Sequence, residues 1–228
     1  NVAVGNLALQ LNTTGTHNVA IGASDGTSGA TLGTNETGSQ NTAIGMQSLK
    51  ANTSADNNSA VGYRSLYANT TGHSNSALGM SALAANTTGI RNTAVGQGAL
   101  LAVTSGANNN GLGSDAGKYI TTGTDNLMLG YLAGAYSSHL TTGTKNICIG
   151  NYTRTNGSTE HNAICIGYDL NANGDVFAFG KGSNKVYNTF TSNASWTRSS
   201  DERKKTNISD STLGLDFIND LSTKTFKW

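Results

Sequence analysis

The chain has 228 residues, no Pro, a formal net charge of +1, and only 12% charged and 7% aromatic residues. Gly, Thr, Asn and Ser together supply 111 of the residues, whereas an ordinary globular domain is about a quarter charged and nearly half apolar. This composition excludes a large conventional core surrounded by charged helices. The balanced charge excludes self-repelling disorder and gives no general basic surface for nucleic acid.

A five-residue motif, Asn-x-Ala-(Val/Ile/Leu)-Gly, organises the chain from residue 1 to residue 167. It closes on Gly5, Gly22, Gly45, Gly62, Gly79, Gly96, Gly113, Gly130, Gly150 and Gly167. These glycines follow a 17-residue period, apart from two longer intervals, one before Gly45 and one before Gly150. A disordered chain has no reason to keep such a register, so the repeat predicts an ordered array of similar units.

One full unit, residues 79–95, holds two short apolar segments, Ala82-Leu83 and Ala94-Val95, separated by a turn at residues 86–89. Asn and Gly tolerate positive φ, and Asn and Thr side chains bond their own backbone, which makes this turn composition suitable for tight bends. The apolar segments are too short for helices and rich in β-forming residues. We therefore predict an all-β fold, a β-solenoid or β-roll with one coil per repeat unit.

Adjacent residues of a strand point to opposite faces, and in this repeat both faces are apolar, as at Ala94 and Val95. One face can line the thin interior of the solenoid, and the other needs a second surface. We expect that surface to be another copy of the chain, so that the strands meet at a shared axis. The motif Asn is expected to stack from coil to coil as an amide ladder.

Other polar and reactive residues of the repeat have structural interpretations. Asn12, Asn69 and Asn86 match glycosylation acceptors and are interpreted as turn residues. The histidines just before the motif are expected to be exposed in turns, at His17, His73 and His161. Two cysteines replace the inward Ala one coil apart and are expected to be buried as small apolar groups, with a disulfide left open, at Cys148 and Cys165.

The chain changes character after the repeat. All five Phe and both Trp lie at or after Phe177, and aromatic residues fill a wider core than a thin coil offers. We therefore expect residues 168–197 to form an aromatic β-stalk in which strands of several chains intertwine. Residues 198–228 carry 11 of the 27 charged residues and an apolar pattern typical of a helix, and they are expected to begin a third domain.

The start of this third domain reads Ser200-Asp201-Glu202-Arg203-Lys204-Lys205-Thr206-Asn207-Ile208. It resembles the opening Ser-Asp-x-Arg-x-Lys-x-x-Ile of the intramolecular chaperone domain found at the C-terminus of phage endosialidases and many tail fibres. The Phe-Lys-Trp at residues 226–228 also matches that family, so the resemblance extends over residues 199–228, the first part of such a domain. It implies an α-containing domain that trimerises, templates the upstream fibre and then cuts itself off.

The same resemblance implies the roles of four residues in a single-turnover autocleavage. Ser200 would be the nucleophile and Lys205 its base, since a Ser hydroxyl is inert at neutral pH until a base takes its proton and a buried Lys can serve. Asp201 would border the cut, and Arg203 would orient or neutralise it. The bond beside Ser200 that breaks stays open, and no cofactor or metal is expected.

The coils are also similar to the head repeats of trimeric autotransporter adhesins, which form parallel β-rolls. The leading hypothesis is a homotrimeric phage tail fibre of the virion that binds a host cell-surface receptor, either a glycan or an outer-membrane component. The insertions at residues 23–40 and 131–145 are the expected binding loops. A bacterial cell-surface adhesin and a fibre-borne polysaccharide depolymerase stay open as alternatives.

The sequence also bears on the surroundings of the chain. No apolar run reaches the length of about 18 residues that a membrane span needs, so membrane insertion is not expected. The chain begins inside a motif, at Asn1, with no charged-then-apolar leader before it. We therefore expect it to be a piece of a longer protein.

Overall fold

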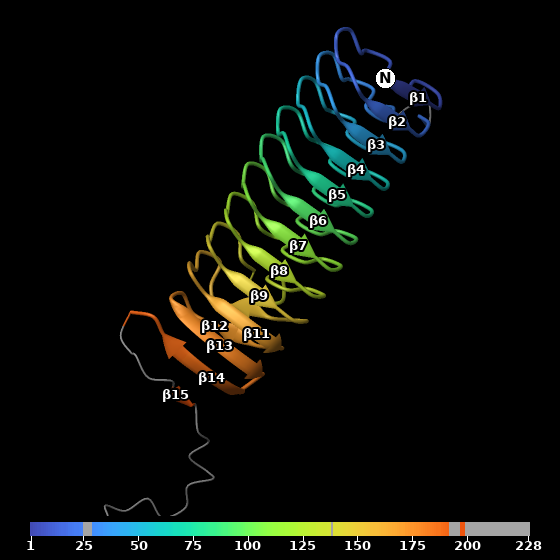
Figure 1. Ribbon diagram of the computed structural model, residues 1–228. Coiled ribbons are helices and arrows are strands. Elements are labelled where there is room, and N and C mark those ends of the chain that lie inside the picture. Colours follow the sequence, from blue (N-terminus) through green and yellow to red (C-terminus); the bar gives the residue numbers. More distant parts are fainter. Residues whose placement is uncertain (25–28, 138, 192–196, 199–228) are drawn as a thin grey trace, which may run out of the picture. The chain divides into compact units, whose positions relative to one another are not determined.

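The computed structural model describes residues 1–24, 29–137, 139–191 and 197–198, and within them it is an all-β solenoid without helices. The coils lie one upon another in a single row, as Figure 1 shows from β1 to β13. The chain divides into two units, Asn1–Arg198 and Ser199–Trp228. The second unit, with the expected chaperone start, lies outside the described residues.

One short strand per coil builds a 13-stranded sheet in the order β1 to β9, β11, β13, β14 and β15. Neighbouring strands are parallel up to β13, and motif residues pair with their counterparts in the next coil, for example Ala77 with Ala94. The strands of this sheet are β1 (Val2–Val4), β2 (Val19–Ile21), β3 (Thr42–Ile44), β4 (Ser59–Val61), β5 (Ser76–Leu78), β6 (Thr93–Val95), β7 (Asn110–Leu112), β8 (Leu127–Leu129), β9 (Ile147–Ile149), β11 (Ile164–Tyr168), β13 (Val176–Lys181), β14 (Asn184–Thr189) and β15 (Thr197–Arg198).

The predicted solenoid is confirmed, and from the second coil on the inward Ala of the motif is buried, as at Ala77 and Ala94. The second apolar segment of the unit is not extended, however. Ala82-Leu83 lies in a tight turn, and Leu83 has a φ of 52° in the left-handed region. A strand there would carry the chain away from the axis, whereas the turn points the buried Leu83 side chain into the core beside the inward Ala.

The motif asparagines form a continuous ladder, as expected, and we call it the first asparagine row. Each Oδ1 accepts the backbone N–H of the Asn one coil later, at 2.8–3.2 Å. Each Nδ2 also donates to a carbonyl in the turn of its own coil, for example from Asn75 to Gly89 at 2.9 Å. The row consists of Asn1, Asn18, Asn41, Asn58, Asn75, Asn92, Asn109, Asn126 and Asn146.

A second asparagine row runs through the turns and was not expected. Each Nδ2 donates to the Oδ1 one coil earlier, at 2.7–3.0 Å, and also to a carbonyl of its own turn. Four of its five members are fully buried. Residues interpreted from the sequence as turn formers are therefore core residues as well. The row consists of Asn12, Asn35, Asn52, Asn69 and Asn86.

The second asparagine row ends at Asn86, whose buried Oδ1 has no hydrogen-bond partner. One coil later the equivalent side chain is Val103, which cannot donate, and Ile120 and Leu140 follow it in the next two coils. The core of these later coils is repacked. Glycine replaces the inward Leu at residue 117, where a Cβ would lie 2.7 Å from Leu100 Cδ2 and 3.1 Å from Ile120 Cδ1.

The glycine that closes each motif has a structural reason. Gly79 has a φ of +135°, and a Cβ there would lie 2.6 Å from the carbonyl oxygen of Gly96 in the next coil. Backbone in this region strains any L side chain, and the next coil leaves no room for one. The register of the repeat is therefore fixed by backbone-to-backbone contact at this corner.

The last described strands complete the solenoid within one chain. A two-stranded sheet joins β10 (Arg154–Thr155) to β12 (Asn171–Ala172). β13 continues the parallel stack on β11, and β14 then turns back against β13 in antiparallel register. This hairpin covers the end of the parallel stack. Intertwining of residues 168–197 with other chains is not tested by a single chain and stays a prediction.

Candidate functional site

The four residues expected to carry autocleavage, Ser200, Asp201, Arg203 and Lys205, all lie outside the described residues. The candidate functional regions of the described part are therefore surfaces of the solenoid. Three features stand out in that part: an apolar column, a cluster of tyrosines, and two cysteines stacked in the core.

The fourth residue of each motif points outward and forms what we call the outer apolar column. Its side chains are exposed or half-buried, reaching 55% exposure at Val4, although every one of them is hydrophobic. Burying such side chains is favourable by about 1.5–3 kcal/mol each, so the column is a candidate subunit interface. Its members are Val4, Ile21, Ile44, Val61, Leu78, Val95, Leu112, Leu129, Ile149, Ile166 and Phe179.

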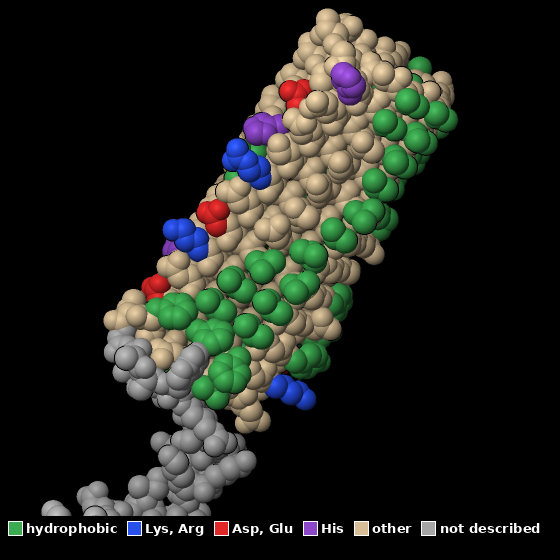
Figure 2. Space-filling model, in the orientation of Figure 1, with side chains coloured by type: hydrophobic (Ala, Val, Ile, Leu, Met, Phe, Trp, Pro, Cys, Tyr) green, Lys and Arg blue, Asp and Glu red, His purple; other side chains and the backbone are tan. Residues whose placement is uncertain are grey.

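This apolar surface broadens toward the C-terminal coils, as Figure 2 shows. The second motif residue also points outward, and in the middle coils it is polar, as at Ser59, Ser76 and Thr93. In the last coils the same column becomes hydrophobic, through Leu127, Ile147, Ile164 and Phe177. The outward face of the strands thus carries one column of hydrophobic side chains in the middle coils and two such columns in the last coils.

Three tyrosines cluster around Tyr152, and no sequence motif marks any of the four. Tyr131, Tyr136 and Tyr168 approach the Tyr152 ring edge-on, with ring centroids 5.4, 4.9 and 5.7 Å away. These three are exposed, at 42%, 42% and 48%. Tyr131 and Tyr136 belong to the insertion at residues 131–145, which the sequence predicted as a binding loop.

Two cations lie against this tyrosine cluster, and the Lys181 ammonium is 5.7 Å from the centre of the Tyr168 ring. The Arg154 guanidinium lies 5.3 Å from the centre of the Tyr136 ring and pairs with Asp169 at 2.6 Å. Loss of water contact, together with the neighbouring Tyr131, Tyr168 and Tyr136, raises the pKa of Tyr152. The surroundings therefore favour the neutral form of Tyr152, and the cluster offers flat apolar ring faces with hydroxyl groups at their edges, a surface suited to polar ligands with apolar faces.

The predictions for the cysteines and histidines are confirmed. Cys148 and Cys165 are fully buried, lie opposite each other on β9 and β11, and are free thiols. The hydrogen bond with the Cys165 thiol, together with burial, raises the pKa of Cys148 well above its usual range. The three histidines expected in turns are exposed: His17, His73 and His161.

In residues 1–24, 29–137, 139–191 and 197–198, no helix is long and apolar enough to cross a membrane. In the same residues, no three His, Cys, Asp or Glu side chains are grouped in a way that could hold a metal ion.

Comparison of the chain with protein-family models, with curated proteins and with solved structures gave no match.

Proposed function

We propose that the chain is a shaft segment of a homotrimeric phage tail fibre, a structural protein of the virion that attaches to a host cell-surface receptor. The outer apolar column is the observation that carries this proposal. It runs from Val4 to Phe179 along the whole stack and is not covered by the described part of the chain itself. A rod with one continuous apolar stripe is suited to parallel association with copies of itself.

Association of copies around a shared axis would explain why the outward columns of the fourth and, near the end, the second motif residues are hydrophobic. With three copies, the outer apolar columns would face one another, and the broader apolar face near β11 and β13 would lie where contact is most extensive. Because a symmetric interface brings the same residues of every copy together, a column of identical chemistry in every coil meets its own kind at every level. The two asparagine rows play no part in this contact, since they are buried and, apart from the Asn86 Oδ1, hydrogen-bonded within each chain.

Sedimentation of the full chain tests the assembly. Wild type is expected to sediment as a trimer, and the double variant Leu78→Lys, Val95→Lys as a smaller species, because it places cations in the apolar column. Thr88→Lys, on an exposed turn, is the matched control and should leave the trimer intact. A wild-type monomer would overturn the trimeric fibre.

The chaperone resemblance supports a second part of the proposal, self-cleavage at the junction before the third domain. Ser200 Oγ would attack the carbonyl of an adjacent peptide bond while the neutral amine of Lys205 takes its proton. Water would then complete hydrolysis, leaving a free carboxylate and a free amine. Asp201 would lie beside the cleaved peptide bond, and Arg203 would orient or neutralise the Asp201 carboxylate.

Intact-mass measurement of the full-length gene product tests this step. Wild type should yield two fragments, whereas Ser200→Ala and Lys205→Ala should each remain uncut. Ser199→Ala is the matched control and should be cut as wild type is. Identical fragment patterns in all four proteins would contradict self-cleavage.

The tyrosine cluster is the proposed receptor contact, because exposed rings and hydroxyl groups suit sugars. Removing Tyr131 and Tyr168 together by Ala substitution should weaken binding to a glycan array, while Tyr63→Ala, an equally exposed tyrosine on a distant coil, should not. Equal binding by all three proteins would exclude this cluster as the contact.

A bacterial trimeric adhesin head is the second candidate, and the parallel coils of this repeat are compatible with the β-rolls of such heads. It uses the same trimer and the same exposed surfaces. Protein identification in purified virions against isolated cell envelopes separates the two. Presence in virions supports the fibre, and presence in envelopes alone supports the adhesin.

A further inference from the structure

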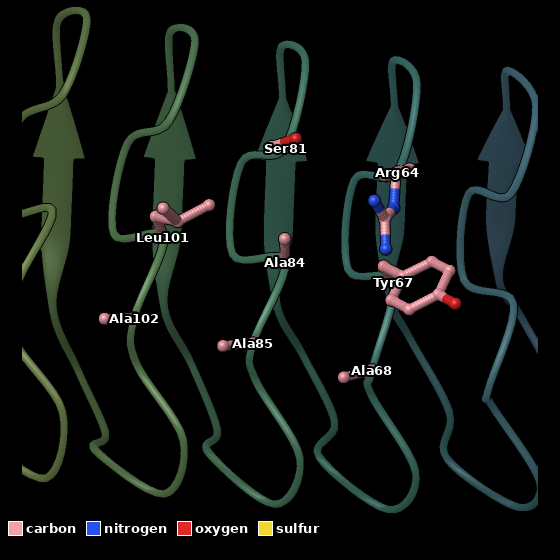
Figure 3. Close-up of a pocket in the computed structure, with 8 residues that line it drawn as sticks. All are labelled: Arg64, Tyr67, Ala68, Ser81, Ala84, Ala85, Leu101 and Ala102. Atoms are coloured by element: carbon pink, nitrogen blue, oxygen red, sulfur yellow. The ribbon is translucent and has the colours of Figure 1, made fainter.

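A hollow of about 500 Å³ opens on the solenoid surface between three neighbouring coils. Figure 3 shows how it arises. Successive coils carry Lys50, Tyr67, Ala84 and Leu101 at the same place, so the small Ala84 leaves a gap between two large side chains. Its apolar surface comes mainly from Ala84, Leu101 and Ala85.

One cation, Arg64, lines the hollow beside Tyr67, and a second, Lys50 of the preceding coil, lies against the same ring without lining the hollow. The Arg64 guanidinium lies 4.2 Å from the centre of the Tyr67 ring. The Lys50 ammonium lies 5.0 Å from the same ring centre and donates a hydrogen bond of 3.1 Å to the Tyr67 hydroxyl. All three side chains are only half-buried, so they are within reach of a ligand.

Two other cations that lie beside tyrosines are paired with carboxylates, whereas Lys181, 5.7 Å from the centre of the Tyr168 ring, has no carboxylate within 4 Å in the described part of the chain. Lys118, beside Tyr119, pairs with Asp115 at 3.2 Å, and Arg154 pairs with Asp169. Among the residues that the structure describes, neither Lys50 nor Arg64 has a carboxylate within 4 Å. The hydrogen bond from Lys50, the attraction of its charge and the nearby Arg64 together lower the pKa of Tyr67. The local field therefore favours a negative group, and the described part of the chain supplies none.

We propose that this hollow binds a carboxylated sugar unit of a surface polysaccharide. The carboxylate would lie on Arg64, because a guanidinium fork matches a carboxylate in shape and charge, and Lys50 would add to the positive field from the far side of Tyr67. The apolar C–H face of the sugar ring would lie on Ala84, Ala85 and Leu101, and the Ser81 hydroxyl would be available to a ring hydroxyl. The inference rests on the proposed attachment function, and it names a ligand class and a second contact surface for it.

The test uses the full chain and an array of oligosaccharides that contain hexuronic or sialic acid. The same sugars as methyl esters, and neutral glucose oligomers, are printed beside them. We expect binding to acidic sugars alone, and weakening of that binding as salt is raised, because partly exposed charges are screened. Equal binding to acids and esters, or no binding to any acidic sugar, would overturn the proposal.

Three variants locate the site, and two of them use residues that the repeat itself holds at the same place. Arg64→Gln copies Gln47 of the preceding coil, whose φ is also positive, so the fold should tolerate it. We expect about tenfold weaker binding from this lost charged hydrogen bond. Ala84→Tyr copies Tyr67, fills the hollow and should abolish binding. Arg91→Gln, at an exposed turn, is the control and should bind as wild type does.

The outcomes separate this inference from the proposed function. Unchanged binding in both Arg64→Gln and Ala84→Tyr would overturn the hollow as the site, whatever the assembly state. Loss of the trimer in sedimentation bears on the fibre and not on the hollow, and weaker glycan binding in the tyrosine-cluster variant bears on the receptor contact proposed there. Sedimentation of each variant shows whether a change in binding follows from misassembly.

Discussion

The coils up to Asn86 and the coils after it share one backbone but differ in how they fill it. The earlier coils hold two rows of buried amides, and the later coils keep the first asparagine row and replace the second with Val103, Ile120 and Leu140. The closing glycines and the strand register are the same in both regions. The outline of the solenoid is thus fixed by the backbone, and its interior tolerates two different chemistries.

The transition between the two regions has a visible cost. An amide row is satisfied only where each Oδ1 faces a donor, and Asn86 faces Val103. A buried carbonyl without a donor costs about 1–3 kcal/mol. A row of this kind therefore carries one unsatisfied oxygen wherever it stops, and this is a reason for a long row to stop only once.

The largest expected effect tests what the two regions share. Gly79→Ala and Gly130→Ala should each destabilise the fold by more than about 3 kcal/mol, since a Cβ would strain the backbone and overlap the next coil. Unfolding in denaturant, followed by circular dichroism, measures this, with Thr88→Ala on an exposed turn as the control. A clear difference between the two glycine variants would show that the backbone differs between the regions after all.

A pair of reciprocal substitutions tests the difference in filling. Asn69→Leu should cost about 2–4 kcal/mol, because Asn52 Oδ1 loses its donor and Asn86 Nδ2 loses one acceptor. Ile120→Asn should cost a similar amount, because its amide would lie between the apolar Val103 and Leu140. The same unfolding measurement applies. Tolerance of Asn69→Leu would mean that the second asparagine row is not needed for stability.

A smaller effect is expected at the transition itself. Asn86→Val should cost about 1 kcal/mol or less, because it moves the unsatisfied oxygen from Asn86 to Asn69 without adding another. Asn69→Val, one coil earlier and inside the row, is the matched comparison and should cost clearly more. Equal costs at the two positions would contradict the account of the row end.

The smallest effect concerns pH in the later region. The pKa of Cys148 is raised in the folded chain, so its contribution to stability is fully present below the unfolded value of about 8.5 and is lost as pH rises through the folded value. The midpoint temperature of thermal unfolding should therefore decrease as pH is raised above about 8.5. The decrease should be smaller in Cys148→Ala, which places the usual inward residue of the motif at this position. An identical pH dependence in both proteins would exclude the thiol as its source.

Much of the fold was predictable from spacing alone. A constant period with Gly at one place, and apolar residues on both faces of a short strand, leaves few alternatives to stacked coils with Ala inside and Val outside. The second asparagine row was missed because an Asn that forms a turn and an Asn buried in a row look alike in sequence. The available signal was the later replacement of Asn86 by Val103, since an exposed turn has no reason to become apolar.

The candidate surfaces were less predictable. The insertion at residues 131–145 was expected to bind a ligand, but the rings that it joins come from other coils. Tyr152 meets both Tyr136 and Tyr168 only because the coils stack and because the insertion follows a path that the sequence does not reveal. The hollow beside Tyr67 likewise depends on the absence of bulk at Ala84, which no motif marks.

The contacts of the asparagine rows reach only to the coils directly before and after, and this has an evolutionary consequence. Removal of residues 75–91 would join Ser74 to Asn92 and bring the Asn58 side chain against Asn92, which is the same contact that it now makes with Asn75. Loss or duplication of one repeat in the gene would thus change the length of the rod by one strand spacing, about 4.8 Å, while every remaining junction stays as it was. The reach of such a rod could be adjusted in equal steps without redesign of its ends.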